Sequence, residues 1–92
     1  MIRNVADKEA KKILGGTPSR RFSADIQPLA RRKLLMLKNV LSLDDLRVPP
    51  ANRLEALKGH RKGQSIRIND QWRICFRWSD GDAEGVEIVD YH

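Results

Sequence analysis

The sequence has few of the residues that form disulfide frameworks, metal sites or membrane spans. Its 92 residues include one cysteine and two histidines, so an internal disulfide is excluded, and no Cys/His spacing typical of a metal site occurs. No stretch approaches the roughly 18 apolar residues of a membrane-spanning helix, and the first residues lack the apolar run of a signal peptide. We therefore expect a cytoplasmic protein without a metal ion or other cofactor.

Charge is distributed unevenly along the chain. Residues 1–63 contain 15 basic and 6 acidic residues, a net charge of +9, whereas residues 64–92 contain 3 basic and 6 acidic residues, a net charge of −3. A surface this basic attracts polyanions such as RNA, although a solvated surface of Lys and Arg fits the same composition. With 40% hydrophobic residues, we expect residues 1–92 to form a single domain.

Two helices are predicted in the N-terminal half. The first covers residues 6–14, follows a short strand at residues 2–5, and ends at Gly15-Gly16. The second lies between about residues 25 and 41, and its apolar face repeats at three- and four-residue steps: Ile26, Ala30, Leu34, Leu37 and Leu41.

Two residues favour a start of this second helix near residue 25. Ser23 is the expected N-cap, and Pro28 is tolerated only in the first turn. Arg31, Arg32, Lys33 and Lys38 are expected around the rest of the helix surface.

Strand patterns dominate the C-terminal half. Residues 42–51 form a connector whose Val48-Pro49-Pro50 disfavours regular structure. Strands are predicted at residues 53–57, 65–69, 72–78 and 85–91, and the clearest of them alternate apolar and polar residues. The fold class is therefore α+β, with helices packed on one face of a curved, mainly antiparallel sheet.

The apolar faces of two of these strands fix their register. Because directly opposed residues share a face, Ile66 should oppose Ile74 and Arg67 should oppose Arg73. This pairing leaves residues 69–71 as a three-residue loop.

For the last pair of strands, we expect Arg77 to oppose Glu87 as a cross-strand ion pair. Arg73 then lies opposite Tyr91, and Arg67, Arg73 and Tyr91 form one row across the polar face. Two adjacent arginines repel each other by roughly 0.2–1 kcal/mol, a cost that an anionic ligand would offset.

Three motifs in the last third of the chain resemble one family. They are Leu57-Lys58-Gly59, Asn69-Asp70-Gln71-Trp72-Arg73 and the terminal Asp90-Tyr91-His92. They resemble the HigB toxins of the RelE/ParE superfamily of type II toxin–antitoxin systems, over residues 1–92 in layout and 52–92 in detail. The resemblance implies a RelE-like fold, with two N-terminal helices packed on a curved, mainly antiparallel sheet.

The resemblance also implies a function. Toxins of this kind are metal-independent endoribonucleases that cut mRNA in the decoding site of the ribosome and thereby inhibit translation. The implied partners are a HigA-like antitoxin and the 70S ribosome with its mRNA, without a membrane and without direct DNA binding outside the antitoxin complex. By motif position, the implied catalytic residues are Lys58, Arg73, Asp90, Tyr91 and His92. The chain departs from some relatives in having Glu55 where they have histidine, and in a loop at 61–65 that is one residue shorter than expected.

These residue types suit metal-free cleavage, in which the ribose 2′-OH attacks its neighbouring phosphate with the help of a base, an acid and cations. Lys58 and Arg73 are candidate phosphate ligands. His92 titrates nearest neutral pH and is a candidate base or acid, Tyr91 is a candidate acid or positioning group, and Asp90 is a candidate to orient His92. Further RNA contacts are expected from Arg67 and from the basic loop residues His60, Arg61 and Lys62.

Each candidate also has a structural interpretation. Arg73 is compatible with a sheet-surface arginine, Tyr91 with a rim aromatic residue and His92 with a frayed terminus. Alternation also places Asp90 and His92 on the opposite face from Tyr91, so the cluster requires the strand to bend or end near residue 90. Glu55 is a candidate general base, but we expect it to pair with a neighbouring arginine. We expect Cys75 to be a small filler residue between Arg73 and Arg77, and Trp72 and Trp78 to lie in the core.

Two other functions remain open at this point. A ParE-like inhibitor of DNA gyrase shares the fold and acts by binding, and a nucleic-acid-binding module would have no catalysis at all. Lys58, Arg73, Tyr91 and His92 favour the nuclease, because an inhibitor that only binds has no need of a terminal acid–base residue. Fold alone does not separate these functions.

Overall fold

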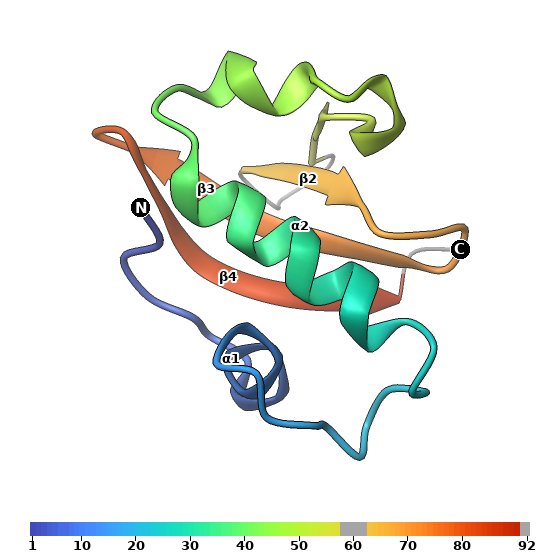
Figure 1. Cartoon of the computed structure of the whole chain (residues 1–92). Helices are drawn as coiled ribbons and strands as arrows, with labels where there is room; N and C mark the ends of the chain where they lie inside the picture. The colour runs from blue at the N-terminus through green and yellow to red at the C-terminus, as the bar shows by residue number, and fades with distance from the viewer. Residues whose placement is uncertain (58–62, 91–92) are drawn as a thin grey trace.

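A computed structural model describes residues 1–57 and 63–90 of the chain. Two α-helices come first, followed by two short 3₁₀ helices and four strands (Figure 1). Their bounds are α1 Lys8–Leu14, α2 Gln27–Asn39, η1 Leu43–Arg47, η2 Pro50–Asn52, β1 Glu55–Ala56, β2 Gln64–Arg67, β3 Trp72–Ser79 and β4 Asp82–Asp90. The strands form one antiparallel sheet in the order β1-β2-β3-β4, which confirms the predicted α+β class.

Helix α1 begins and ends where the sequence predicts to within two residues. The carboxylate of Asp7 caps it by accepting a hydrogen bond from the Glu9 N–H at 2.9 Å. Gly15 ends the helix, as expected. The preceding residues run beside β4 and form two isolated parallel bridges with it, Ile2 with Ala83 and Val5 with Val86, where a short strand was predicted.

Helix α2 is shorter than predicted at both ends. Its N-cap is Ile26, so the prediction of Ser23 as N-cap is wrong. Ser23 instead forms a side-chain hydrogen bond with Asp25, and this bond lowers the pKa of that carboxyl group. Pro28 lies in the first turn as expected. Leu41 lies beyond the helix and is 87% exposed, so its assignment to the core is wrong.

The connector between α2 and β1 is more regular than predicted. It contains η1 and η2, which flank the Val48-Pro49 bond. Asn52 ends η2 with none of its surface exposed, and its Nδ2 donates to the Leu46 carbonyl at 3.0 Å. A buried amide with its partners in place fixes this connector against the end of the core.

The predicted register of β2 and β3 is confirmed. Ile66 opposes Ile74 and Arg67 opposes Arg73. The Asn69 side chain holds the three-residue loop, because its Oδ1 accepts hydrogen bonds from the N–H groups of Gln71 and Trp72 at 2.9 and 2.8 Å.

The predicted register of β3 and β4 is wrong. Arg77 opposes Glu84, and Cys75 opposes Glu87. The strands join through a two-residue turn at Asp80-Gly81, in which both residues have positive φ, the geometry of a type I′ hairpin. One extra residue in β4 near Gly85 then shifts the pairing as a β-bulge. As a result Arg73 lies opposite Val89, and the predicted row with Tyr91 does not form.

The core lies between the helices and one face of the sheet. Ala30, Leu34 and Leu37 of α2 are buried against strand residues such as Ile66 and Ile74. Figure 1 shows α2 crossing this face, with α1 beside the edge strand β4. In the part of the chain that the structure describes, every helix falls short of the length and apolarity needed to cross a bilayer.

Candidate nucleic-acid interface and active site

The candidate residues that the structure describes gather mainly on the sheet face turned away from the helices. Residues directly opposed in a sheet share a face, so pairing defines rows across the strands. One row runs through Glu55, Ser65, Cys75 and Glu87, and the adjacent row through Arg67, Arg73 and Val89, at the end where the β2–β3 loop begins.

Arg73 is the anchor of this face. Only 7% of its surface is exposed. Its Nε donates to the Ser65 hydroxyl at 2.9 Å, and its Nη2 donates to the carbonyl oxygens of Arg53 and, at 3.3 Å, of Ser65. The guanidinium group therefore lies across β2 and binds the chain just before β1. It links three segments of the fold, which a solvent-facing sheet arginine would not do.

Acidic residues accompany both arginines of the predicted pair. Arg67 forms an ion pair with Asp70 in the β2–β3 loop. The Glu55 carboxylate lies 3.9 Å from Arg73 Nη2 and is about half exposed, which supports the expected pairing of Glu55 with an arginine. Neighbouring carboxylates therefore reduce the repulsion expected between the two arginines, and the proximity of these arginines is by itself no sign of an anionic ligand.

The predictions that Cys75 is a small filler residue and that both tryptophans pack on the core are confirmed. Cys75 is buried and has a free thiol. Trp72 and Trp78 are partly buried against the core, and Trp72 meets Phe22 edge-on with 5.0 Å between ring centroids.

Asp90 ends β4 at the same end of the sheet as Arg73. It pairs with Trp72, and its Oδ2 accepts a hydrogen bond from Gln71 Nε2 at 3.2 Å. Because Asp90 is paired with Trp72, its side chain lies on the same sheet face as Trp72 and on the opposite face from Arg73. Arg73 and Asp90 therefore share an end of the sheet but not a face. Tyr91 and His92 follow directly and lie outside the described residues.

Lys58, His60, Arg61 and Lys62 also lie outside the described residues, but the ends of their segment are placed. Leu57 N–H donates to the Gly63 carbonyl at 3.0 Å. Gly63 has φ of +130°, and a Cβ there would lie 2.3 Å from the Phe76 carbonyl oxygen. Only glycine fits at this close approach. The residues that flank the basic segment, Leu57 and Gly63, therefore lie beside Gln64. From Gln64 to Arg67 is three residues along β2, a distance of about 10 Å.

Lys33 is a buried cation that the sequence interpretation missed. It is 8% exposed, and its Nζ donates to Asn52 Oδ1. Burial lowers the pKa of Lys33, and the charges of Arg32 and Arg67 lower it further. The helical spacing indicates that position 33 is buried, because it completes an i, i+3, i+4, i+7 stripe with Ala30, Leu34 and Leu37.

A metal site finds no support in the described part of the chain. Across residues 1–57 and 63–90, no three His, Cys, Asp or Glu side chains lie close enough together to hold an ion.

Comparison with known proteins decides the family. The model of the HigB-like toxins, RelE-like toxins of type II toxin–antitoxin systems, matches residues 5–92. The chain belongs to this HigB-like toxin family. The family that the three sequence motifs indicated is confirmed, and membership implies a HigA antitoxin as partner.

Individual relatives agree with this assignment. A Vibrio cholerae protein named toxin HigB-1 is 45% identical over 65 residues, which cover 70% of this chain and 68% of the relative. A Proteus vulgaris protein named endoribonuclease HigB is 44% identical over 41 residues, 44% of this chain and 45% of the relative. An uncharacterized Haemophilus influenzae protein is 31% identical over 74 residues, 79% of this chain and 73% of the relative.

Proposed function

We propose that this HigB-family toxin is a metal-independent endoribonuclease that cuts mRNA on the 70S ribosome. The observation that carries the proposal is the family match over residues 5–92, because it spans all the candidate residues from Lys58 to His92. One relative in the family bears the name endoribonuclease. The 2′-OH of the nucleotide before the cut acts as nucleophile, which needs no metal ion when a base, an acid and cations are present.

In this proposal Arg73 supplies a fixed positive charge. The serine hydroxyl and the backbone carbonyl oxygens that bind its guanidinium group are neutral and orient the cation, while the half-exposed Glu55 carboxylate, 3.9 Å from Nη2, offsets part of its charge. A cation oriented before the substrate arrives stabilises the developing phosphorane charge without a cost of reorganisation. Arg67, on the same face one strand away, contributes to RNA binding once its exposed partner Asp70 is displaced.

The remaining roles follow the motif positions. Lys58 binds the phosphate, and His60, Arg61 and Lys62 contact the RNA backbone from the same segment. Tyr91 and His92 supply the acid and the base, and Asp90 orients His92. Asp90 supports this placement, because it brings the end of the chain to the end of the sheet where Arg67 and Arg73 lie.

The variants His92→Ala, Tyr91→Phe and Lys58→Ala test these roles against Lys38→Ala, which removes an exposed cation of α2 on the helix side of the sheet. The assay is single-turnover cleavage of mRNA bound to purified 70S ribosomes. Loss of a general acid or base lowers the rate by about 10²–10⁴-fold, so we expect losses of this size for His92→Ala and Tyr91→Phe. Lys38→Ala should cleave at the wild-type rate.

The same proteins are assayed for inhibition of gyrase supercoiling. Rates within about threefold of wild type for all three site variants would overturn the proposed roles. Inhibition of gyrase without cleavage would replace the nuclease with a toxin that acts by binding.

A further inference from the structure

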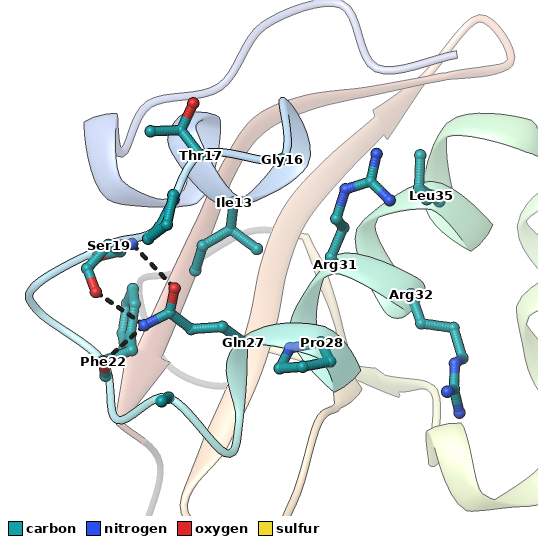
Figure 2. Close-up of a pocket in the computed structure, with 12 residues that line it drawn as sticks. Ile13, Gly16, Thr17, Ser19, Phe22, Gln27, Pro28, Arg31, Arg32 and Leu35 are labelled. Carbon is teal, nitrogen blue, oxygen red and sulfur yellow. Dashed lines mark hydrogen bonds between the residues drawn. The ribbon is translucent and has the colours of Figure 1, made fainter.

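A hollow with an apolar floor lies on the helix side of the molecule, away from the candidate site. It is enclosed by the end of α1, the loop from residue 16 to 24 and the first turns of α2 (Figure 2), and has a volume of about 800 Å³. Its apolar lining includes Ile13, Pro18, Phe22, Pro28 and Leu35. A hollow of this size admits several side chains of a partner.

The wall of this groove is held in place by one glutamine. Gln27 Oε1 accepts from the Ser19 N–H at 2.9 Å, while its Nε2 donates to the carbonyl oxygens of Ser19 and Phe22, both at 2.7 Å. Figure 2 shows Gln27 reaching from α2 to this loop. The Ser19 hydroxyl in turn donates to Glu9 of α1 at 2.7 Å. A partner therefore meets a preformed groove and does not have to order the loop.

The groove carries positive charge. Arg31 and Arg32 line it and are exposed, and the Arg31 guanidinium lies beside the end of α1, where a Cβ on Gly16 would be 3.7 Å from its Nε. In the described residues neither arginine forms an ion pair. The carboxylate within α1, that of Glu9, is already engaged by Ser19 and by Lys12 at 3.1 Å.

The apolar lining and the positive charge of the groove discriminate between two kinds of anionic partner, RNA and an acidic peptide. RNA would find two arginines here, but the face of the Phe22 ring is already covered by Arg21, so this aromatic residue of the lining offers a base no surface to stack on. A peptide with apolar side chains along one edge and carboxylates along the other matches both the floor and the charge. We infer that this groove binds an acidic, amphipathic segment of the HigA antitoxin. The inference rests on membership of the HigB-like toxin family, which implies the antitoxin, and not on the proposed nuclease activity.

The test compares two double charge reversals of equal net charge. Arg31→Glu with Arg32→Glu alters the groove, and Lys8→Glu with Lys38→Glu alters exposed helix cations outside its lining. The probe is the purified cognate antitoxin, and its dissociation constant for each full-length toxin is measured by titration calorimetry at low and high salt. Thermal unfolding of each variant checks that the fold persists, and Arg31→Gln with Arg32→Gln serves as a milder second pair.

We expect the groove reversal to weaken antitoxin binding by about 10–100-fold at low salt and less at high salt, with the control within about threefold of wild type. Equal affinities of both variants would overturn the inference. The inference would also be overturned if the groove variant kept its antitoxin affinity but lost ribosome binding, because the groove would then bind the ribosome. An unchanged antitoxin affinity with an altered oligomeric state would overturn it too, because the groove would then bind a second copy of the toxin. If the wild-type toxin cleaves no mRNA but the groove variant alone loses the antitoxin, the nuclease proposal fails and the groove assignment stands.

Discussion

Replacing Arg73 by alanine removes a buried cation that joins three segments of the fold. The side chain donates from Nε to the Ser65 hydroxyl and from Nη2 to the backbone carbonyls of Ser65 and Arg53. The Arg73→Ala variant loses these bonds together with the packing of the aliphatic stem. We therefore expect a large loss of stability as well as any loss of activity.

The structure sets the size of this loss. A hydrogen bond from a charged group contributes about 1.5–3 kcal/mol, and three bonds from one side chain are not independent, so we expect a total of about 3–5 kcal/mol. A domain of this length has only about 5–15 kcal/mol of stability in all. At about 4–8 °C per kcal/mol, the melting temperature falls by roughly 12 °C or more.

The assay is urea unfolding followed by circular dichroism and tryptophan fluorescence, with Arg73→Ala, Ser65→Ala and the double variant forming a cycle. Because Ser65 is a direct partner, we expect a coupling energy of about 0.5–3 kcal/mol. A change below about 0.5 kcal/mol for Arg73→Ala, or a coupling near zero, would refute this account of Arg73. The result also affects the activity assay, because Arg73→Ala is informative about cleavage only at a temperature where the variant is folded. Arg73→Lys keeps the charge but not the forked geometry, and is the better variant for that purpose.

Three further predictions concern the core, the basic segment and pH. Leu34→Ala removes a fully buried side chain and should lower the unfolding free energy by about 2–5 kcal/mol, whereas Lys38→Ala should change it by less than about 0.5 kcal/mol in the same urea titration. Gly63→Ala forces a Cβ against the Phe76 carbonyl and should cost about 1–3 kcal/mol; ribosomal cleavage that stays at the wild-type rate would show that the segment it anchors is not needed. The Lys33 pKa lies below the usual 10.5 in the folded protein, so folding disfavours its charged form. The unfolding free energy of the wild type relative to Lys33→Met should therefore rise as the pH increases from the folded-state pKa of Lys33 towards its unfolded-state pKa. A difference that stays constant or falls over this pH range would contradict the burial of Lys33.

The sequence was sufficient where side-chain alternation left one solution. In β2 and β3, the matching of Ile66 with Ile74 fixed both the pairing and the three-residue loop. In β3 and β4 it fixed the face but not the register, because a shift of two residues leaves every side chain on the same face. The Asp80-Gly81 turn carries a local signal for this register, and Gly85, a glycine within the strand pattern with a positive φ, carries one for the bulge.

Burial of polar groups was the harder part to predict. Arg73 was correctly placed on the polar face, but alternation does not reveal that Ser65 and the Arg53 carbonyl bind its guanidinium group. Lys33 was assigned to the surface although its spacing placed it on the apolar stripe. Its partner Asn52 comes from a connector that no periodicity describes. Contacts between elements distant in sequence decide these positions.

We propose that this toxin cuts mRNA through the ribose 2′-OH, and only on the ribosome. The most direct measurement is primer extension on one mRNA with purified wild-type toxin, with and without 70S ribosomes, beside the same mRNA carrying a single 2′-deoxynucleotide immediately before the cut. We expect the toxin to cut this mRNA only when ribosomes are present, and not to cut at that position in the deoxy-substituted mRNA. Cleavage of free mRNA, or a cut that persists next to the 2′-deoxynucleotide, would contradict it.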